Sequence, residues 1–257
     1  MTDAPVASDR VYRAVVGAVA ALFRLQGYRF DVQGTEHLPA EGAAVLAANH
    51  NSLLDFTLVG RAARPRGRLV RFMAKRSLFG RGPVGWAMRR MGHIPVDRAS
   101  GAVAYRRARR WLERGDVVGV FPEATISRSW LVKPLRRGAA ALALETGTPL
   151  VPVVTWGGHR ILTVDGHRSL RRRIPVTIRV GTALDPRPGE SVAALTERLH
   201  EALSSLLATA MDAYPETPRD DEDRWWLPHD RGGTAPDPET AHALDVAAVQ
   251  RIGDSLE

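Results

Sequence analysis

The stretch "AAVLAANHNSLLDFTLVGRAA", residues 43–63, runs from an apolar segment through a short polar turn into a helical pattern. Residues 43–49 predict a strand, because a short apolar run bounded by polar residues is typical of a strand covered on both faces. Residues 52–63 predict a helix, with Ser52 as its N-cap and Asp55 completing a capping box. A strand that leads directly into a helix is the building unit of α/β folds.

Short apolar runs and helical patterns alternate along most of the chain. The alternation predicts an α/β fold with a mixed, largely parallel central sheet flanked by helices. A chain of 257 residues with 44% hydrophobic residues can bury one sizeable core, so residues 28–214 are expected to form one main domain. Further strands are predicted at 28–34, 68–74, 93–96, 117–122, 150–157 and 174–181, and helices at 82–92, 101–115, 138–147 and 191–214.

Residues 1–27 are expected to form an N-terminal helical segment. Its apolar run, residues 14–23, has about half of the ~20 residues needed to span a bilayer. An amphipathic helix of this kind either packs on its own domain or lies in a membrane interface, and the sequence leaves both alternatives open. The apolar side chains that recur at helical spacing are Val11, Val15, Val19, Leu22 and Leu25.

The last part of the chain, residues 215–257, changes in character. It contains 4 basic and 11 acidic residues, is rich in Pro and Gly, and shows no clear periodicity. These properties predict an extended acidic tail rather than a second domain. The adjacent Trp225 and Trp226 are expected to hold this tail against the body of the protein, with contact to a membrane interface as the alternative.

The remainder of the chain is strongly cationic. The whole protein has a net charge of +8, so the acidic tail leaves a clear excess of arginine in residues 1–214. Such a body favours an anionic partner: nucleic acid, anionic lipid or a phosphorylated substrate. Scattered arginines and only 6% aromatic residues argue against nucleic acid. The absence of cysteine excludes a disulfide scaffold, thiolate zinc sites and a cysteine nucleophile.

His50 and Asp55 are the first candidate catalytic pair. Five residues apart on one helix, their side chains would point about 140° away from each other. A strand-to-helix turn can bring them together, at the carboxyl end of a strand where α/β folds bind ligands. A histidine oriented by a carboxylate is what general-base chemistry on an alcohol requires. The spacing alone is a weak signal, and the alternative is that Asp55 serves only as a helix cap.

A second polar motif, "FPEATISRS", occupies residues 121–129 after another predicted strand. Pro122 ends the strand and leaves Glu123, Thr125, Ser127 and Arg128 in a loop. Arginine pairs with phosphate and a carboxylate accepts protons from hydroxyl groups, so this loop could hold a phosphorylated polyol. The alternative is an ordinary polar loop without a ligand.

Four motifs in this order, "NHNSLLD", "MGHIPVDR", "FPEATIS" and "LVPVVTWG", resemble the four sequence blocks of the glycerolipid acyltransferase family. The family includes 1-acyl-glycerol-3-phosphate acyltransferase, and the resemblance covers roughly Gly34 to Gly181. It implies transfer of a fatty acyl group from a coenzyme A or acyl-carrier-protein thioester to the hydroxyl of a lysophospholipid. The acceptor it implies first is 1-acyl-glycerol-3-phosphate, which would give phosphatidic acid in phospholipid biosynthesis.

The resemblance also implies roles for single residues. His50 would be the base and Asp55 its orienting partner, while Arg98 and Glu123 would bind the acceptor. Thr125, Ser127 and Arg128 belong to the same substrate-binding loop. The residues that would shape the loops and the fourth block are Gly92, Pro122 and Pro152.

The third motif departs from the family pattern F-P-E-G-T-R-S at two positions. Ala124 replaces the glycine, and Ile126 replaces an arginine that customarily contacts phosphate. Arg128 or Lys75 could supply the missing charge. The departure leaves open another lysolipid or a glycolipid as the acceptor.

The expected mechanism is direct transfer, with His50 taking the proton of the acceptor hydroxyl. An acyl intermediate on Ser52 or Ser127 is disfavoured, because neither serine lies in a G-x-S-x-G elbow.

No metal and no cofactor are expected beyond the co-substrate, acyl-CoA or acyl-carrier protein. The other expected partners are a membrane lipid acceptor and an anionic membrane surface, with no nucleic acid. The expected location is peripheral, on the cytoplasmic face of the cell membrane. The alternative of a different class is a non-catalytic basic protein that binds membranes or nucleic acid.

Overall fold

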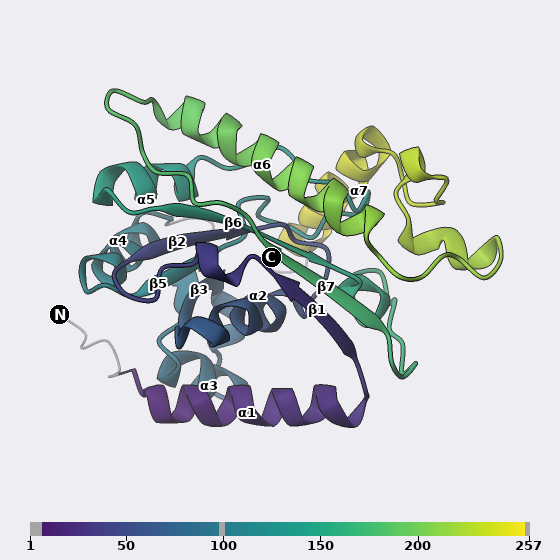
Figure 1. Cartoon of the computed structure of the whole chain (residues 1–257), viewed down its shortest axis with the longest axis horizontal. Helices are drawn as coiled ribbons and strands as arrows, with labels where there is room; N and C mark the ends of the chain where they lie inside the picture. Colours follow the sequence, from purple (N-terminus) through teal and green to yellow (C-terminus); the bar gives the residue numbers. More distant parts are fainter. Residues whose placement is uncertain (1–6, 98–100, 255–257) are drawn as a thin grey trace.

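The computed structural model describes residues 7–97 and 101–254, with side chains described up to residue 247. Its centre is a seven-stranded sheet with the strand order β1-β7-β6-β2-β5-β3-β4 (Figure 1). β6 and β7 pair antiparallel, and the other neighbouring pairs are parallel. The prediction of a mixed, largely parallel sheet is therefore confirmed. The strands are β1 (Arg29–Gln33), β2 (Ala44–Ala48), β3 (Val70–Lys75), β4 (Ile94–Val96), β5 (Val117–Val120), β6 (Leu150–Trp156) and β7 (Pro175–Val180).

Strand β2 lies in the middle of the sheet, between β5 and β6. All five of its residues are buried, in keeping with its continuous apolar run, and all residues of β6 and β7 are buried too, including the polar Thr155, Thr177 and Arg179. β2 is parallel to both neighbours, so the segments that follow β2, β5 and β6 leave the sheet at the same edge. The first, third and fourth motifs therefore meet there.

Helices cover both faces of the sheet. Leu58 and Val59 of α2 and Phe23 of α1 belong to a core on one face. Leu142 of α5 and Leu199 of α6 belong to the core on the opposite face, which α4 also helps to form. The α-helices described within residues 9–97 and 101–212 are α1 (Asp9–Leu25), α2 (Asp55–Ala63), α3 (Pro83–Arg90), α4 (Gly101–Glu113), α5 (Gly138–Thr146) and α6 (Val192–Asp212).

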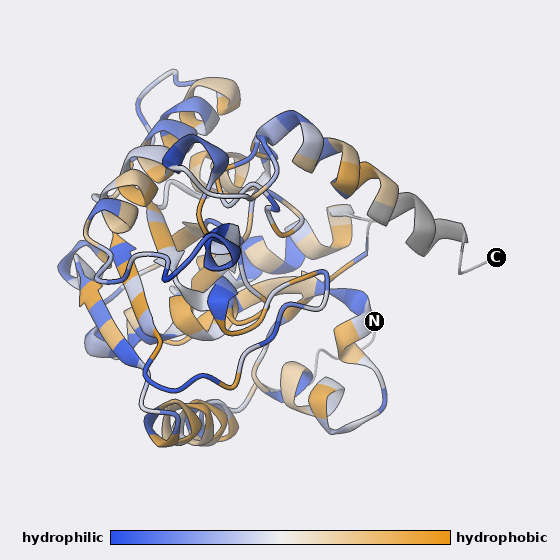
Figure 2. Ribbon diagram, turned by 90° about the vertical axis from the view of Figure 1, so that its right-hand side faces the viewer, coloured by the Kyte–Doolittle hydropathy of each residue, from blue (hydrophilic) through white to orange (hydrophobic). Residues whose placement is uncertain are grey.

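Helix α1 packs against the domain and is seen end-on at the bottom of Figure 2. The buried Tyr12 donates a 2.7 Å hydrogen bond to the carbonyl oxygen of Val70, and Phe23 is also buried. The predicted apolar stripe holds only in part, since Leu22 and Leu25 are 55% and 70% exposed. At 100° per residue, they point about 100° and 160° away from Phe23, so they cannot share its contact with the sheet. Across the described residues, we find no helix with the length and apolar character needed to cross a membrane.

The C-terminal segment folds back on the domain instead of following the extended course expected from its composition. It forms two short 3-10 helices, η5 (Glu222–Trp226) and η6 (His229–Arg231), and then α7 (Pro238–Asp254), seen in yellow in Figure 1. Its carboxylates pair with arginines of the cationic body, for example Glu216 with Arg160 at 2.8 Å. These ion pairs join the acidic segment to the cationic body.

Trp225 and Trp226 hold this segment in place, as predicted. Trp226 is fully buried, and its carbonyl oxygen accepts a 3.0 Å hydrogen bond from His159 Nε2. The carbonyl oxygen of Trp225 accepts a 2.9 Å hydrogen bond from Trp130 Nε1. Burial lowers the pKa of His159 to about 3, so its ring is neutral and part of the packing at ordinary pH.

Candidate active site

The turn between β2 and α2 is held on both sides by buried asparagines. Asn49 forms two hydrogen bonds with the backbone of Thr155 on β6, at 3.1 Å to its carbonyl oxygen and 2.8 Å from its N–H. Asn51 Nδ2 donates a 3.2 Å hydrogen bond to the carbonyl oxygen of Trp130. His50 lies between the two asparagines with its side chain 21% exposed. The turn is thus fixed while its imidazole remains accessible.

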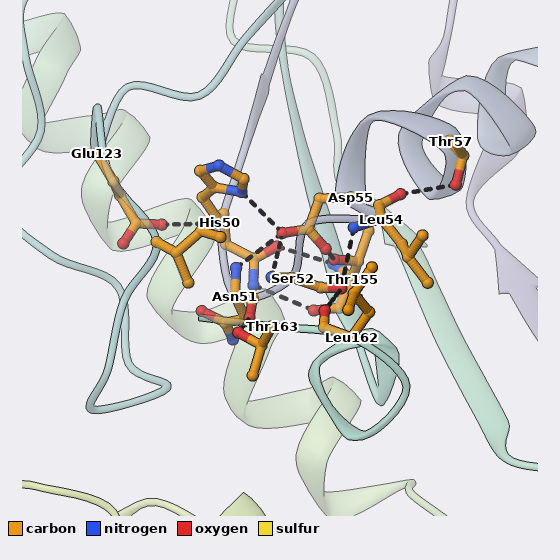
Figure 3. A network of polar contacts seen from close by, with 12 residues as sticks. His50, Asn51, Ser52, Leu54, Asp55, Thr57, Glu123, Thr155, Leu162 and Thr163 are labelled. Carbon is orange, nitrogen blue, oxygen red and sulfur yellow. Dashed lines mark hydrogen bonds and ion pairs between the residues drawn. The ribbon is translucent and has the colours of Figure 1, made fainter. Parts of the chain in front are cut away.

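The Asp55 carboxylate is the centre of the network drawn in Figure 3. Its Oδ2 atom lies 2.9 Å from His50 Nδ1 and accepts the backbone N–H groups of Asn51 at 2.8 Å and Ser52 at 2.7 Å. Its Oδ1 atom accepts the Thr155 hydroxyl at 2.7 Å. Four donors therefore converge on one fully buried carboxyl group.

This arrangement fixes the tautomer of His50. Because the carboxylate of Asp55 can only accept, His50 Nδ1 carries the proton of that hydrogen bond. Nε2 then has a free lone pair, and it forms no hydrogen bond with any residue that the structure describes. The pair can therefore take a proton from a hydroxyl group that is bound in front of Nε2.

The capping box of the sequence prediction is only half formed. Helix α2 begins at Asp55, not at Ser52, and the Ser52 N–H does bond the Asp55 carboxylate. The Ser52 hydroxyl, however, accepts from the N–H of Leu54 at 3.1 Å and donates to the carbonyl oxygen of Leu162 at 2.6 Å. This hydroxyl is buried and engaged in both of these hydrogen bonds, which weighs against Ser52 as a nucleophile.

Glu123 joins the third motif to the turn of His50. One carboxyl oxygen accepts the backbone N–H of His50 at 2.8 Å, and the other accepts that of Lys133 at 3.1 Å. The N–H of Ser127 bonds the carbonyl oxygen of His50 at 2.7 Å, so both backbone groups of His50 are held by this loop. Burial raises the pKa of Glu123 to about 8, and these two hydrogen bonds and the Lys133 ammonium oppose the shift.

The sequence prediction missed two residues that position His50. The ring of Phe121 stacks on the imidazole at a centroid distance of 4.4 Å, and it stacks in turn on Phe72 at 5.9 Å. Thr155 is the second, through its hydroxyl bond to Asp55. Both belong to quoted motifs, Phe121 to the third and Thr155 to the fourth, but their contacts arise only when β5 and β6 lie on either side of β2.

The other predicted site residues occupy different environments. Ser127 is fully buried, and its hydroxyl donates to the carbonyl oxygen of Leu131 at 2.7 Å, so it supports the loop. Lys75 is exposed at the end of β3, without a side-chain partner in the part of the chain that the structure describes. Arg98 lies outside the described residues. Thr125 accepts a 2.5 Å hydrogen bond from Lys133 Nζ.

The positive charge near the third motif comes from Lys133 and Arg128, and Asp245 of α7 pairs with both. These contacts were not predicted from the sequence. Lys133 Nζ lies 2.5 Å from the Thr125 hydroxyl and 2.6 Å from Asp245 Oδ2 of α7. Arg128 pairs with the same Asp245 and, at 2.7 Å, with Asp165. Lys133 thus places an ammonium beside the position where Ile126 lacks a charge, but α7 already provides an anion for it.

Ala124 adopts a backbone conformation that favours glycine. Its φ is 64°, in the left-handed region, at the position where the family pattern has glycine. Gly92 of the second motif has a φ of 72°, and a Cβ atom there would lie 3.1 Å from the ring of Trp111. The loop at Gly92 therefore requires glycine. At Ala124 the backbone adopts the same left-handed conformation, but with an alanine, whose Cβ atom makes this conformation strained.

An apolar groove lies between α1 and α2. It is lined mainly by valines of α1 together with Phe23, Phe56 and Met91. Phe56 directly follows Asp55, so the groove borders the element that begins at the candidate site. No group of three or more metal-binding side chains is found among the side chains that the structure describes, those of residues 7–97 and 101–247.

The comparisons with known proteins agree with one another. The sequence model of the family described as "Acyltransferase" matches residues 29–156. The chain is 34% identical over 140 residues to a chloroplastic 1-acyl-sn-glycerol-3-phosphate acyltransferase of Brassica napus, which covers 52% of this chain and 39% of that relative. It is 27% identical over 203 residues to the 1-acyl-sn-glycerol-3-phosphate acyltransferase of Bacillus subtilis, covering 76% of this chain and 96% of the relative. The chain thus spans about two fifths of the plant relative and nearly all of the bacterial one.

A solved structure shares the fold. The 1-acyl-sn-glycerophosphate acyltransferase PlsC of Thermotoga maritima superposes with a TM-score of 0.66 at 23% sequence identity. The superposition covers 80% of this chain and 81% of that one. The observed sheet and its covering helices are therefore those of a known architecture.

Proposed function

Because residues 29–156 of this chain form an acyltransferase domain of the glycerolipid acyltransferase family, we propose that the protein transfers a fatty acyl group from a thioester to a lysophospholipid. The proposed acceptor is 1-acyl-glycerol-3-phosphate and the product phosphatidic acid, in keeping with the names of the plant and bacterial relatives. The observation that carries the proposal is the 2.9 Å contact between His50 Nδ1 and Asp55 Oδ2, with Nε2 left accessible.

The proposed chemistry is a single direct transfer. The acceptor hydroxyl gives its proton to His50 Nε2 while its oxygen attacks the thioester carbonyl carbon. Asp55 stabilises the imidazolium that forms and keeps the ring in the productive tautomer. The carbon–sulfur bond then breaks, and the departing thiolate takes the proton back from His50. The ester product and the free thiol leave the enzyme in its starting state.

Binding of the acceptor phosphate is proposed to involve Lys133 and Thr125. Their side chains lie together beside Ile126, and Lys133 is one of only two lysines in the chain. An acceptor phosphate would compete there with Asp245, which already pairs with Lys133. Lys75 and Arg98 remain proposed further contacts. The same competition favours, as a second candidate, a lysolipid or glycolipid whose headgroup needs no cation at this place.

A peripheral position on the membrane is also proposed, on its cytoplasmic face. Leu22 and Leu25 of α1, together with Val84 and Trp86 of α3, expose large apolar side chains, and α1 contacts α3. Apolar side chains of this kind favour insertion into the interfacial region, and the surrounding arginines favour anionic headgroups. The apolar groove between α1 and α2 would hold an acyl chain close to Asp55.

The test is an acceptor screen with purified protein. Palmitoyl-coenzyme A and palmitoyl-acyl-carrier protein are each offered with lysophosphatidate, other lysophospholipids and a glycolipid, and products are identified by mass spectrometry. We expect phosphatidate from the wild type and none from a folded His50→Ala variant. Acylation of a different acceptor alone would reject lysophosphatidate as the substrate. Near-normal turnover by His50→Ala would reject the general-base role.

A further inference from the structure

Besides the apolar groove between α1 and α2, the protein has a polar pocket that lies apart from the His50–Asp55 pair. It is open, has a cavity volume of about 210 Å³, and is formed by the segment between β6 and β7 together with the C-terminal segment. Four arginines line it, along with Trp225 and a single carboxylate, Asp223. The lining arginines are Arg160, Arg168, Arg171 and Arg219.

The carboxylates around this pocket do not balance its arginines. Glu216 alone accepts from Arg160 at 2.8 Å and Arg171 at 2.9 Å and lies 3.5 Å from Arg29. Asp223 pairs with Arg219 at 3.2 Å. Three guanidinium groups therefore share Glu216, a fourth pairs with Asp223, and Arg168 pairs with neither carboxylate.

Arg168 is the free cation of the set. Its side chain is exposed and has no hydrogen bond or ion pair within the described parts of the chain. If the cluster served only to fasten the C-terminal segment, the pairs of Glu216 and Asp223 would suffice, and Arg168 would add only repulsion. Its position in the wall of the pocket leaves its guanidinium available to a further anion.

The pocket is also held in shape before any ligand arrives. Arg160 is buried, and its guanidinium lies 4.0 Å from the centroid of the Trp226 ring. His167 stacks on Trp225 at 4.4 Å with an interplanar angle of 5°. Guanidinium groups that are fixed in this way lose little conformational freedom when they bind an anion.

The charge and geometry select the chemical class of that anion. Guanidinium groups match the oxygens of phosphate in pairs, and a phosphate monoester or diphosphate carries more than one negative charge. A single carboxylate would leave most of the surplus charge uncompensated. The arginines converge on one concavity and do not follow a continuous stripe, unlike the basic surfaces that track nucleic acid.

The pocket shares one loop with the candidate active site. The carbonyl oxygen of Leu162 accepts from the N–H of Leu53 at 3.2 Å and from the Ser52 hydroxyl at 2.6 Å (Figure 3). The Thr163 hydroxyl donates to the carbonyl oxygen of Asn51 at 2.7 Å. The segment that supplies Arg160 and Arg168 therefore also braces the turn that carries His50.

We propose that this pocket binds the phosphate groups of a small phosphorylated ligand, and that in the proposed acyl transfer this ligand is the coenzyme A part of the donor. The assignment to coenzyme A rests on the proposed function; the phosphate site itself does not. With its phosphates in the pocket, the donor would extend its thioester end along the shared loop toward His50.

The test compares Arg168→Ala with Arg106→Ala, a matched control on the exposed face of α4 at the other end of the sheet. Binding of inorganic pyrophosphate to the full chain is measured by calorimetry. We expect binding by the wild type and by Arg106→Ala, and at least about tenfold weaker binding by Arg168→Ala, the loss of one charged hydrogen-bonding group. No pyrophosphate binding by the wild type, or equal binding by all three proteins, would overturn the phosphate site.

A kinetic arm tests the identity of the ligand. KM is measured for palmitoyl-coenzyme A and for palmitoyl-pantetheine, which lacks the phosphate groups. Arg168→Ala should raise KM for the first donor and leave it unchanged for the second. If Arg168→Ala weakens binding to vesicles that contain phosphatidate but leaves both KM values unchanged, the phosphate comes from a lipid headgroup and the coenzyme A assignment is wrong. Loss of pyrophosphate binding in a protein without acyltransferase activity would uphold the phosphate site and reject the proposed function.

Discussion

The Oδ2 atom of Asp55 lies 2.9 Å from His50 Nδ1 and within 2.8 Å of the backbone N–H groups of Asn51 and Ser52. One oxygen therefore orients the imidazole and closes the start of α2 at the same time. Its contacts show the structural role directly, and they also fit the catalytic role, which stays a prediction. A variant of Asp55 that loses the negative charge but keeps a hydrogen-bond acceptor is needed to distinguish the catalytic role from the structural one.

Asp55→Asn is expected to keep the fold and lose most of the activity. The amide oxygen can still accept from the turn, but the negative charge that stabilises the imidazolium is gone, so kcat should fall by at least about 100-fold. Thr155→Val, which removes only the hydroxyl bond to Oδ1, should reduce kcat much less. Steady-state kinetics and thermal unfolding of both variants make the comparison. Equal effects of the two substitutions would contradict the role of the charge.

The buried carboxyl group of Glu123 should make stability depend on pH. Its pKa is raised from 4.5 to about 8 in the folded protein, chiefly by burial. Between these values the folded state holds a proton that the unfolded state has released, so this group's contribution to the free energy of unfolding falls as pH rises from 4.5 to 8. Glu123→Gln should remove that part of the pH dependence. Denaturant unfolding of both proteins across this range checks the expectation, and identical pH profiles would contradict it.

Asp245→Asn should strengthen the binding of a phosphorylated acceptor. The substitution removes the anion that now pairs with Lys133 at 2.6 Å and leaves the Lys133 ammonium available to phosphate, while Arg128 keeps its second partner, Asp165. KM for lysophosphatidate should fall about threefold or more, with little change in kcat. The matched control is Asp165→Asn, which removes a partner of Arg128 but leaves Lys133 paired. An unchanged KM in a variant with normal thermal unfolding would show that the acceptor phosphate binds elsewhere.

Ala124→Gly should stabilise the protein. Ala124 has a φ of 64°, where a Cβ atom costs about 1–2 kcal/mol, and the greater freedom of glycine in the unfolded chain offsets part of that gain. The expected net increase in unfolding free energy is about 0.5–1 kcal/mol. Gly92→Ala, at φ 72° and close to Trp111, should have the opposite sign. Chemical denaturation of the two variants tests the pair, and a destabilised Ala124→Gly protein would refute the argument from backbone strain.

The sequence by itself determined the α/β alternation, because buried strands and amphipathic helices have different periods of apolar residues. It also predicted the pairing of His50 with Asp55, since both lie at one strand-to-helix turn and the three further motifs follow in the order of the family. The expectation that two tryptophans fasten the C-terminal segment followed from their polar surroundings and is met by the buried Trp226.

Only the tertiary structure decided which groups surround that pair. Thr155 and Phe121 reach Asp55 and His50 because β6 and β5 flank β2, an order that no local pattern encodes. Lys133 meets Asp245 across 112 residues of sequence, and this contact, rather than the motif, sets the charge beside Ile126. Composition predicted an extended tail for residues 215–257, because a count of charges does not include the arginines of the body that a folded segment can pair with.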